Sequence, residues 1–110
     1  MIETILIDYL TDALDVFVGM EPKTELTDYV IVDKTGSSRT NHIITSTFAV
    51  QSYGASLYEA LQLNKRVEAA MFSMLELPEV ARVELETDYN FTDTTTKQYR
   101  WQAVYQITHY

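Results

Sequence analysis

Alternation of apolar and polar side chains near the end of the chain constrains its fold more than any other feature. In VARVELETDYNF, residues 80–91, and in QYRWQAVYQITHY, residues 98–110, apolar residues recur at alternate positions. In a strand successive side chains point to opposite faces, so residues at alternate positions share one face. The polar stretch TDTTTK lies between the segments, so together they predict an antiparallel hairpin that is apolar on one face.

The remainder of the chain predicts two helices and three further strands. Apolar residues at helical spacing indicate amphipathic helices over residues 2–15 and 57–76, the second ended by Pro78. VFVGM, DYVIVDKTG and HIITSTFAVQSY are typical of strands, the last two joined by a loop at SSRTN. We therefore predict one α+β domain over residues 1–110. It has the order α-β-β-β-α-β-β, with two helices packed on one face of a mostly antiparallel five-stranded sheet.

Charge and composition exclude several classes of function. The formal net charge is −8 and cysteine is absent, which excludes disulfides and thiolate metal sites. The eight basic residues are scattered, so a basic face that wraps nucleic acid is not expected. The start, MIETILIDYLTDALD, lacks the basic region of a signal peptide, and no apolar run approaches the roughly 20 residues that span a bilayer. The sequence predicts a soluble protein.

The stretch AVQSYGASLYEALQ, residues 49–62, predicts a strand that turns directly into a helix. No lysine follows Gly54 as in a phosphate-binding loop, and the second glycine of a nucleophile elbow is missing. Ser56 and Glu59 fit a capping box, in which each side chain accepts from the other residue's backbone N–H. Gly54 is expected to supply the unusual backbone angles of the turn. We interpret Gly54, Ser56 and Glu59 as a structural corner.

Two groups of residues offer an alternative reading as an enzyme or a ligand-binding domain. Glu84, Glu86 and Asp88 are expected on one strand face about 6.5–7 Å apart, where they could act as an acid/base pair or hold a cation. A solvated strand face, with Arg100 of the next strand paired to one carboxylate, explains them more simply. His42 and His109 have no zinc-binding spacing, although a Ser/His/Asp set assembled in space stays open. No catalytic residue, metal or cofactor is predicted.

The aromatic residues and the sheet edges point to an assembly. Most of the eight tyrosines lie on predicted strands, and four aromatic residues are expected on the buried face of the last hairpin: Tyr89, Tyr99, Trp101 and Tyr105. The pattern of RNA-binding aromatic strands is missing. Tyrosine is also favoured where proteins meet, and the open edges of a five-stranded sheet need cover. A partner or a ring would supply it.

Taken in order, these segments resemble the tail terminator, or tail completion, proteins of long-tailed bacteriophages. The resemblance covers nearly the whole chain. It runs through the first helix, VFVGMEP, YVIVDKTG, FAVQSYGASLYEALQLNKRVEAAM and VELETDYNFTD…YRWQAVYQI. Its sharpest part is the strand-to-helix pattern made by Ser52, Tyr53, Ser56, Glu59, Ala60 and Leu61.

The resemblance implies a non-enzymatic morphogenesis protein that forms a hexameric ring. Such a ring caps the tail tube at its set length and offers a surface to the head connector, and DNA later passes through it. The implied partners are further copies of the chain, the tail tube protein and the connector, with DNA as cargo and no membrane. The implied location is the tail or neck of the virion, after assembly in the host cytoplasm. From the net charge we expect an acidic lumen that repels DNA.

Two polar loops are the predicted contact sites within this reading. They span residues 36–41 and 92–97, and polar hairpin tips of this kind often carry binding residues. The candidates are Ser37, Ser38, Arg39, Thr40 and Asn41 in the first loop and Asp93, Thr94, Thr95, Thr96 and Lys97 in the second. Another neck or head-completion component remains the nearest alternative function.

Overall fold

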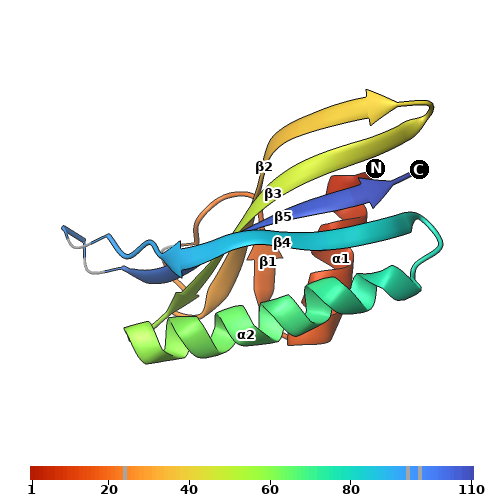
Figure 1. Cartoon of the computed structure of the whole chain (residues 1–110). Helices are drawn as coiled ribbons and strands as arrows, with labels where there is room; N and C mark the ends of the chain where they lie inside the picture. Colours follow the sequence, from red (N-terminus) through yellow and green to blue (C-terminus); the bar gives the residue numbers. More distant parts are fainter. Residues whose placement is uncertain (24, 94, 97) are drawn as a thin grey trace.

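The computed structural model describes residues 1–23, 25–93, 95–96 and 98–110, and it confirms the predicted order of elements (Figure 1). The helices are α1 (Ile2–Leu14) and α2 (Leu57–Ser73), and a 3-10 turn (Met74–Glu76) extends the second. The strands are β1 (Phe17–Gly19), β2 (Tyr29–Thr40), β3 (Ile43–Gly54), β4 (Val80–Asn90) and β5 (Tyr99–His109). Neither helix of this described part is long and apolar enough to cross a membrane.

The five strands form one mixed, mostly antiparallel sheet, as predicted. Their spatial order is β1-β2-β3-β5-β4. β1 runs parallel to β2, and each of the other neighbouring pairs is antiparallel. β3 and β5 occupy the middle of the sheet and pair from Ile44–His109 to Gly54–Tyr99. The outer edges of the sheet therefore belong to β1 with the free part of β2 on one side and to β4 on the other.

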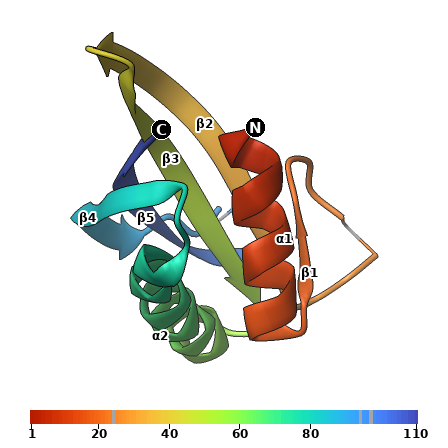
Figure 2. The same ribbon diagram turned by 90° about the vertical axis from the view of Figure 1, so that its right-hand side faces the viewer.

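Both helices cover the same face of the sheet, which confirms the predicted two layers (Figure 2). The buried residues of α1 recur every fourth position, and α2 buries one stripe in the same way. These stripes meet the inner side chains of the strands in a single apolar core, since water is excluded most effectively where two apolar faces coincide. Members of that core include Leu6, Leu10, Val30, Phe48, Val67, Met71, Tyr105 and Ile107.

The two helices are tied together where α1 ends. Asp15 adopts a left-handed conformation (φ 55°) and its N–H donates to the carbonyl of Thr11, which closes the helix. The guanidinium of Arg66, on α2, donates to the carbonyl of Leu14. A cation is favourable at this end of a helix because the free carbonyls carry partial negative charge.

A bulge in β4 corrects the predicted face of Tyr89. The register of β4 against β5 shifts between Leu85 and Thr87, so one extra residue enters β4 there. Beyond the shift, side chains that strict alternation assigns to one face lie on the other. Tyr89 pairs with Gln102 on the face away from the helices, whereas Tyr105 is fully buried under them. The prediction that these aromatics share one face was wrong for Tyr89.

Candidate functional site

The first predicted loop is part of a long hairpin instead. Residues 36–40 continue β2 and pair with β3, so Ser37, Ser38, Arg39 and Thr40 are strand residues. The chain reverses through only two residues, Asn41 and His42, with φ values of 51° and 68°. Two successive positive φ values define the tight turn whose twist matches that of paired strands. Its short length explains why the predicted loop was wrong: the strands extend almost to the reversal point.

This hairpin projects beyond the rest of the sheet as an arm, defined here as residues 35–43 (Figure 1). Every residue of the arm is exposed, and at its tip Ile43 keeps 42% of its surface in contact with solvent. β1 pairs with β2 only as far as Ile31, and β5 pairs with β3 only as far as Ile44. Most of the arm therefore belongs to a three-stranded part of the sheet, and only the Thr40–Ile43 pair extends past β5. Within the described strands, the outer edge of β2 has unpaired backbone groups along the arm.

The second predicted loop joins β4 to β5 at the opposite end of the molecule (Figure 1). A bridge between Asp93 and Gln98 closes it. The Asp93 carboxylate accepts from the N–H of Thr95 (2.9 Å) and from that of Thr96 (3.4 Å). These bonds lower the pKa of Asp93, because they favour its charged form. Thr94 and Lys97, also predicted contact residues, lie outside the described residues.

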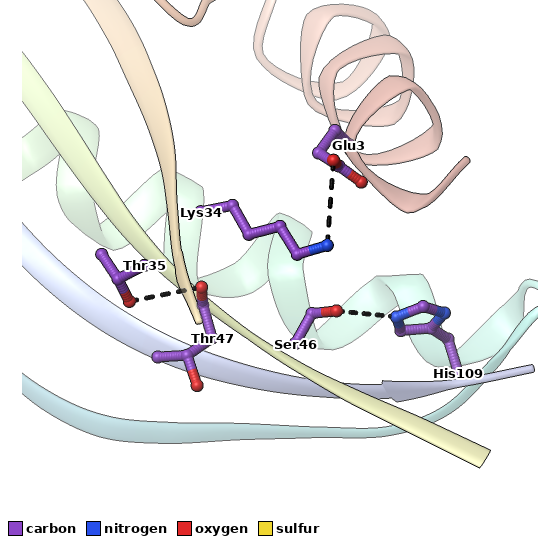
Figure 3. A network of polar contacts seen from close by, with 6 residues as sticks. All are labelled: Glu3, Lys34, Thr35, Ser46, Thr47 and His109. Carbon is purple, nitrogen blue, oxygen red and sulfur yellow. Dashed lines mark hydrogen bonds and ion pairs between the residues drawn. The ribbon is translucent and has the colours of Figure 1, made fainter. Parts of the chain in front are cut away.

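A groove of about 610 Å³ separates the base of the arm from the start of α1. Figure 3 shows Lys34 reaching from β2 toward Glu3 on α1, with 3.8 Å between Lys34 Nζ and Glu3 Oε2. Below this pair, Ser46 Oγ lies 2.9 Å from His109 Nε2 (Figure 3). Arg39 also lines the groove, so two strands, β2 and β5, and one helix contribute polar groups to it.

His109 is the buried titratable group of this groove. Its imidazole is 6% exposed, at the end of β5. Burial lowers its pKa below the ordinary 6.5, and the positive charge of Lys34 acts in the same direction. A hydrogen bond with the backbone of Tyr110 and the charge of Glu3 partly oppose this. A neutral imidazole can accept from the Ser46 hydroxyl, so the geometry accounts for His109 as a structural residue.

The strand-to-helix corner has the predicted cap but uses its glycine differently. Ser56 precedes α2 with extended backbone angles and accepts from the N–H of Glu59 at 3.2 Å. The reciprocal bond from Ser56 N–H to the Glu59 carboxylate is not formed among the described residues. Gly54 has no positive φ, so the expected unusual backbone angles were wrong. A Cβ on Gly54 would lie 2.6 Å from the backbone nitrogen of Ala60, so glycine is needed for close packing.

The acidic stripe expected on β4 is divided between the two faces of the sheet. Glu84 lies opposite Gln106, and Glu86 accepts from the Gln106 side chain at 2.6 Å on that face. Asp88 lies opposite the fully buried Ala103 and accepts from Trp101 Nε1 at 3.1 Å on the helix side. The bulge between Leu85 and Thr87 causes this division. Glu84 and Glu86 therefore keep a shared face, whereas Asp88, the third member of the predicted stripe, does not lie on it.

Arg100 belongs to an aromatic network that the sequence did not indicate. The rings of Tyr29 and Tyr53 stack at 4.3 Å on the sheet face away from the helices. Arg100 Nη1 donates to Tyr53 Oη (3.1 Å), its Nε donates to the carbonyl of Phe91 (2.7 Å), and the guanidinium lies 4.6 Å from the centre of the Phe91 ring. The predicted pairing of Arg100 with a β4 carboxylate was wrong. The Arg100 guanidinium instead stacks on the Phe91 ring, where β4 and β5 begin to separate.

No protein-family model matches the chain, and no curated protein matches it. The fold and its surfaces, together with the sequence resemblance, are therefore the basis for a functional proposal.

Proposed function

We propose that this chain is a ring-forming tail terminator of a long-tailed bacteriophage. In this role it acts without catalysis. A ring of copies, expected to be a hexamer, caps the tail tube when elongation ends and gives the head connector a surface to join. DNA is cargo that passes through the ring. The protein would reside in the tail or neck of the virion after assembly in the host cytoplasm.

The exposed arm is the observation that carries the proposal. All nine residues of the arm are exposed, and no described strand pairs with the outer edge of β2 along them. An unpaired strand edge of this kind invites contact with another chain. An assembly protein would gain from such a projection, because the arm can bind a neighbour while the body keeps its fold. The α-β-β-β-α-β-β order also agrees with the fold that the resemblance implies.

Tail tubes assembled without heads give a direct test. Purified protein is mixed with them and examined by electron microscopy and by native mass spectrometry. We expect a density cap at one tube end and a hexameric mass in the presence of tubes. Monomers that persist at all concentrations and never bind tube ends would contradict the proposal.

A head-completion or connector protein would give a different binding order. Such a protein binds heads before tails, whereas a terminator binds finished tails first. Co-sedimentation with heads lacking tails, compared with tails lacking heads, separates the two. Binding to heads alone would reassign the chain to the neck on the head side.

A further inference from the structure

The arm differs in charge from the rest of this acidic chain. From Lys34 to Tyr58 the sequence contains no aspartate and no glutamate, although the whole chain has 16 acidic residues. The cations of this stretch are Lys34, whose Nζ lies near Glu3, and Arg39, which is exposed on the arm. Among the described residues Arg39 forms no ion pair. The arm therefore presents a positive charge with no carboxylate on the same ribbon.

The opposite charge is concentrated in the first quarter of the chain. Residues 1–28 contain seven acidic residues and one lysine, which accounts for −6 of the net charge of −8. Six of these carboxylates are exposed, on α1 and on the connections that flank β1, and we call them the acidic N-terminal surface: Asp8, Asp12, Asp15, Glu21, Glu25 and Asp28. Figure 2 shows α1, β1 and the connection after β1 side by side along one flank of the molecule.

The arm of one molecule points away from most of this surface. In Figure 2 the arm extends past the N-terminal end of α1, whereas Asp12 and Asp15 belong to the other end of that helix. Complementary charges at separated places on one chain favour a contact between two copies in head-to-tail arrangement. A contact of that kind uses different patches on the two partners and can close into a ring.

We propose that the arm of one copy binds the acidic N-terminal surface of the next copy, with Arg39 as its central cation. This inference rests on the proposed ring and names the two surfaces that meet in it. The apolar side chain of Ile43 at the tip is covered by the same contact. Attraction between the two surfaces also offsets the repulsion expected between subunits that each carry a charge of −8.

Charge reversal on each side tests the contact. Arg39→Glu removes the arm's exposed cation, and Asp8→Lys with Asp12→Lys reverses part of the acidic surface. The combined variant carries all three changes and restores complementarity with exchanged signs. Lys65→Glu is the matched control, because Lys65 is exposed on α2 and belongs to neither of the two surfaces as defined. Far-UV circular dichroism confirms that each variant is folded.

Self-association is measured by sedimentation velocity over a concentration series, alone and with tail tubes. We expect Arg39→Glu to weaken association about tenfold or more, Lys65→Glu to leave it near wild type, and the combined variant to regain most of the loss. An Arg39→Glu variant that associates normally, or a combined variant no better than Arg39→Glu, would overturn the proposal. A folded Arg39→Glu variant that keeps its self-association but no longer binds tube ends would also overturn the proposal, since the arm would then bind the tube protein.

The same measurements separate this inference from the proposed function. A wild-type chain that caps tube ends as single subunits overturns the arm contact and leaves capping in place. A chain that associates through the arm but ignores tube ends overturns the terminator function and leaves the contact in place.

Discussion

At the scale of single residues, Gly54 is the position where one added methyl group should cost most. A Cβ there would lie 2.6 Å from Ala60 N and 2.9 Å from the carbonyl carbon of Glu59, both backbone atoms of α2. Because backbone cannot move aside as a side chain can, we expect Gly54→Ala to lower the free energy of unfolding by about 1–3 kcal/mol. Urea titration, followed by the fluorescence of the single tryptophan, measures this.

Gly36→Ala provides the matched control, since the same change there meets nothing within 4 Å. Gly36 lies in the arm with no positive φ, so alanine should be neutral or stabilise by up to about 1 kcal/mol. Equal losses at the two glycines would show that close packing at the corner does not explain Gly54. The sequence identified Gly54 as a corner residue, but only the distance to Ala60 reveals why glycine is required.

His109 should make the stability of the fold depend on pH. Its folded pKa is lowered by burial, so between 6.5 and that lower value only the unfolded chain binds a proton. The free energy of unfolding therefore falls as the pH falls through this window. At pH values above the window, the free energy of unfolding does not depend on the protonation of His109. Urea titrations at pH 7.5 and 5.5 should show a smaller difference for His109→Gln than for the wild type.

A second variant separates the contribution of His109 to the pH dependence from that of the carboxylates, which also titrate in acid. His42→Asn removes the other histidine from the exposed turn and keeps a residue that tolerates positive φ. We expect it to retain the pH dependence of the wild type. A His109→Gln variant with an unchanged pH dependence would contradict the assignment to the buried imidazole.

At the scale of elements, the sequence was sufficient to predict where helices and strands form. It was not sufficient to predict the register in which neighbouring strands pair. The turn at Asn41 and His42, taken without a bulge, would place Tyr29 opposite Gly54. The irregularity between Lys34 and Gly36 moves the register by one residue, so Tyr29 meets Tyr53 and stacks on it. A slip of one residue exchanges the faces of a strand. Neither bulge has a sequence signal strong enough to locate it, so the divided acidic stripe and the aromatic network could not be foreseen.

The arm's turn offers a prediction for a whole element. His42 holds φ at 68°, which costs a residue with a side chain more than it costs glycine, and Asn-Gly is the preferred pair for such a turn. We expect His42→Gly to stabilise the hairpin by up to about 1 kcal/mol. Hydrogen exchange of the amide protons in residues 35–46 should then be slower.

Thr40→Gly tests whether the gain comes from the turn. Thr40 is the last strand residue before it, where glycine loses more backbone freedom on folding than threonine does. This variant should exchange faster than the wild type by the equivalent of roughly 0.5–1 kcal/mol. If both glycine variants change exchange in the same direction, backbone flexibility and not turn geometry controls the arm.

At the scale of the whole molecule, the two-layer arrangement could be predicted from the spacing of apolar residues in the sequence, because amphipathic helices and strands pack so that their apolar faces are buried. The candidate site was only partly predictable. The sequence singled out Arg39 and its neighbours as contact residues, but it predicted a polar loop where the structure has a paired strand. The groove at Lys34 and His109 joins residues 75 positions apart, and such pairs become visible only when strand order is known.

Salt should act on folding and on assembly in opposite directions. A net charge of −8 on 110 residues destabilises the compact state by self-repulsion. Salt screens this repulsion, because the Debye length falls from about 10 Å at 0.1 M salt to about 3 Å at 1 M. We expect the melting temperature of the isolated chain to rise with sodium chloride, while association through oppositely charged surfaces weakens. The Asp8→Lys and Asp12→Lys variant, with a formal charge of −4, should show a shallower rise. A melting temperature that falls with salt in both proteins would mean that attractive ion pairs, and not net repulsion, dominate the electrostatics of the monomer.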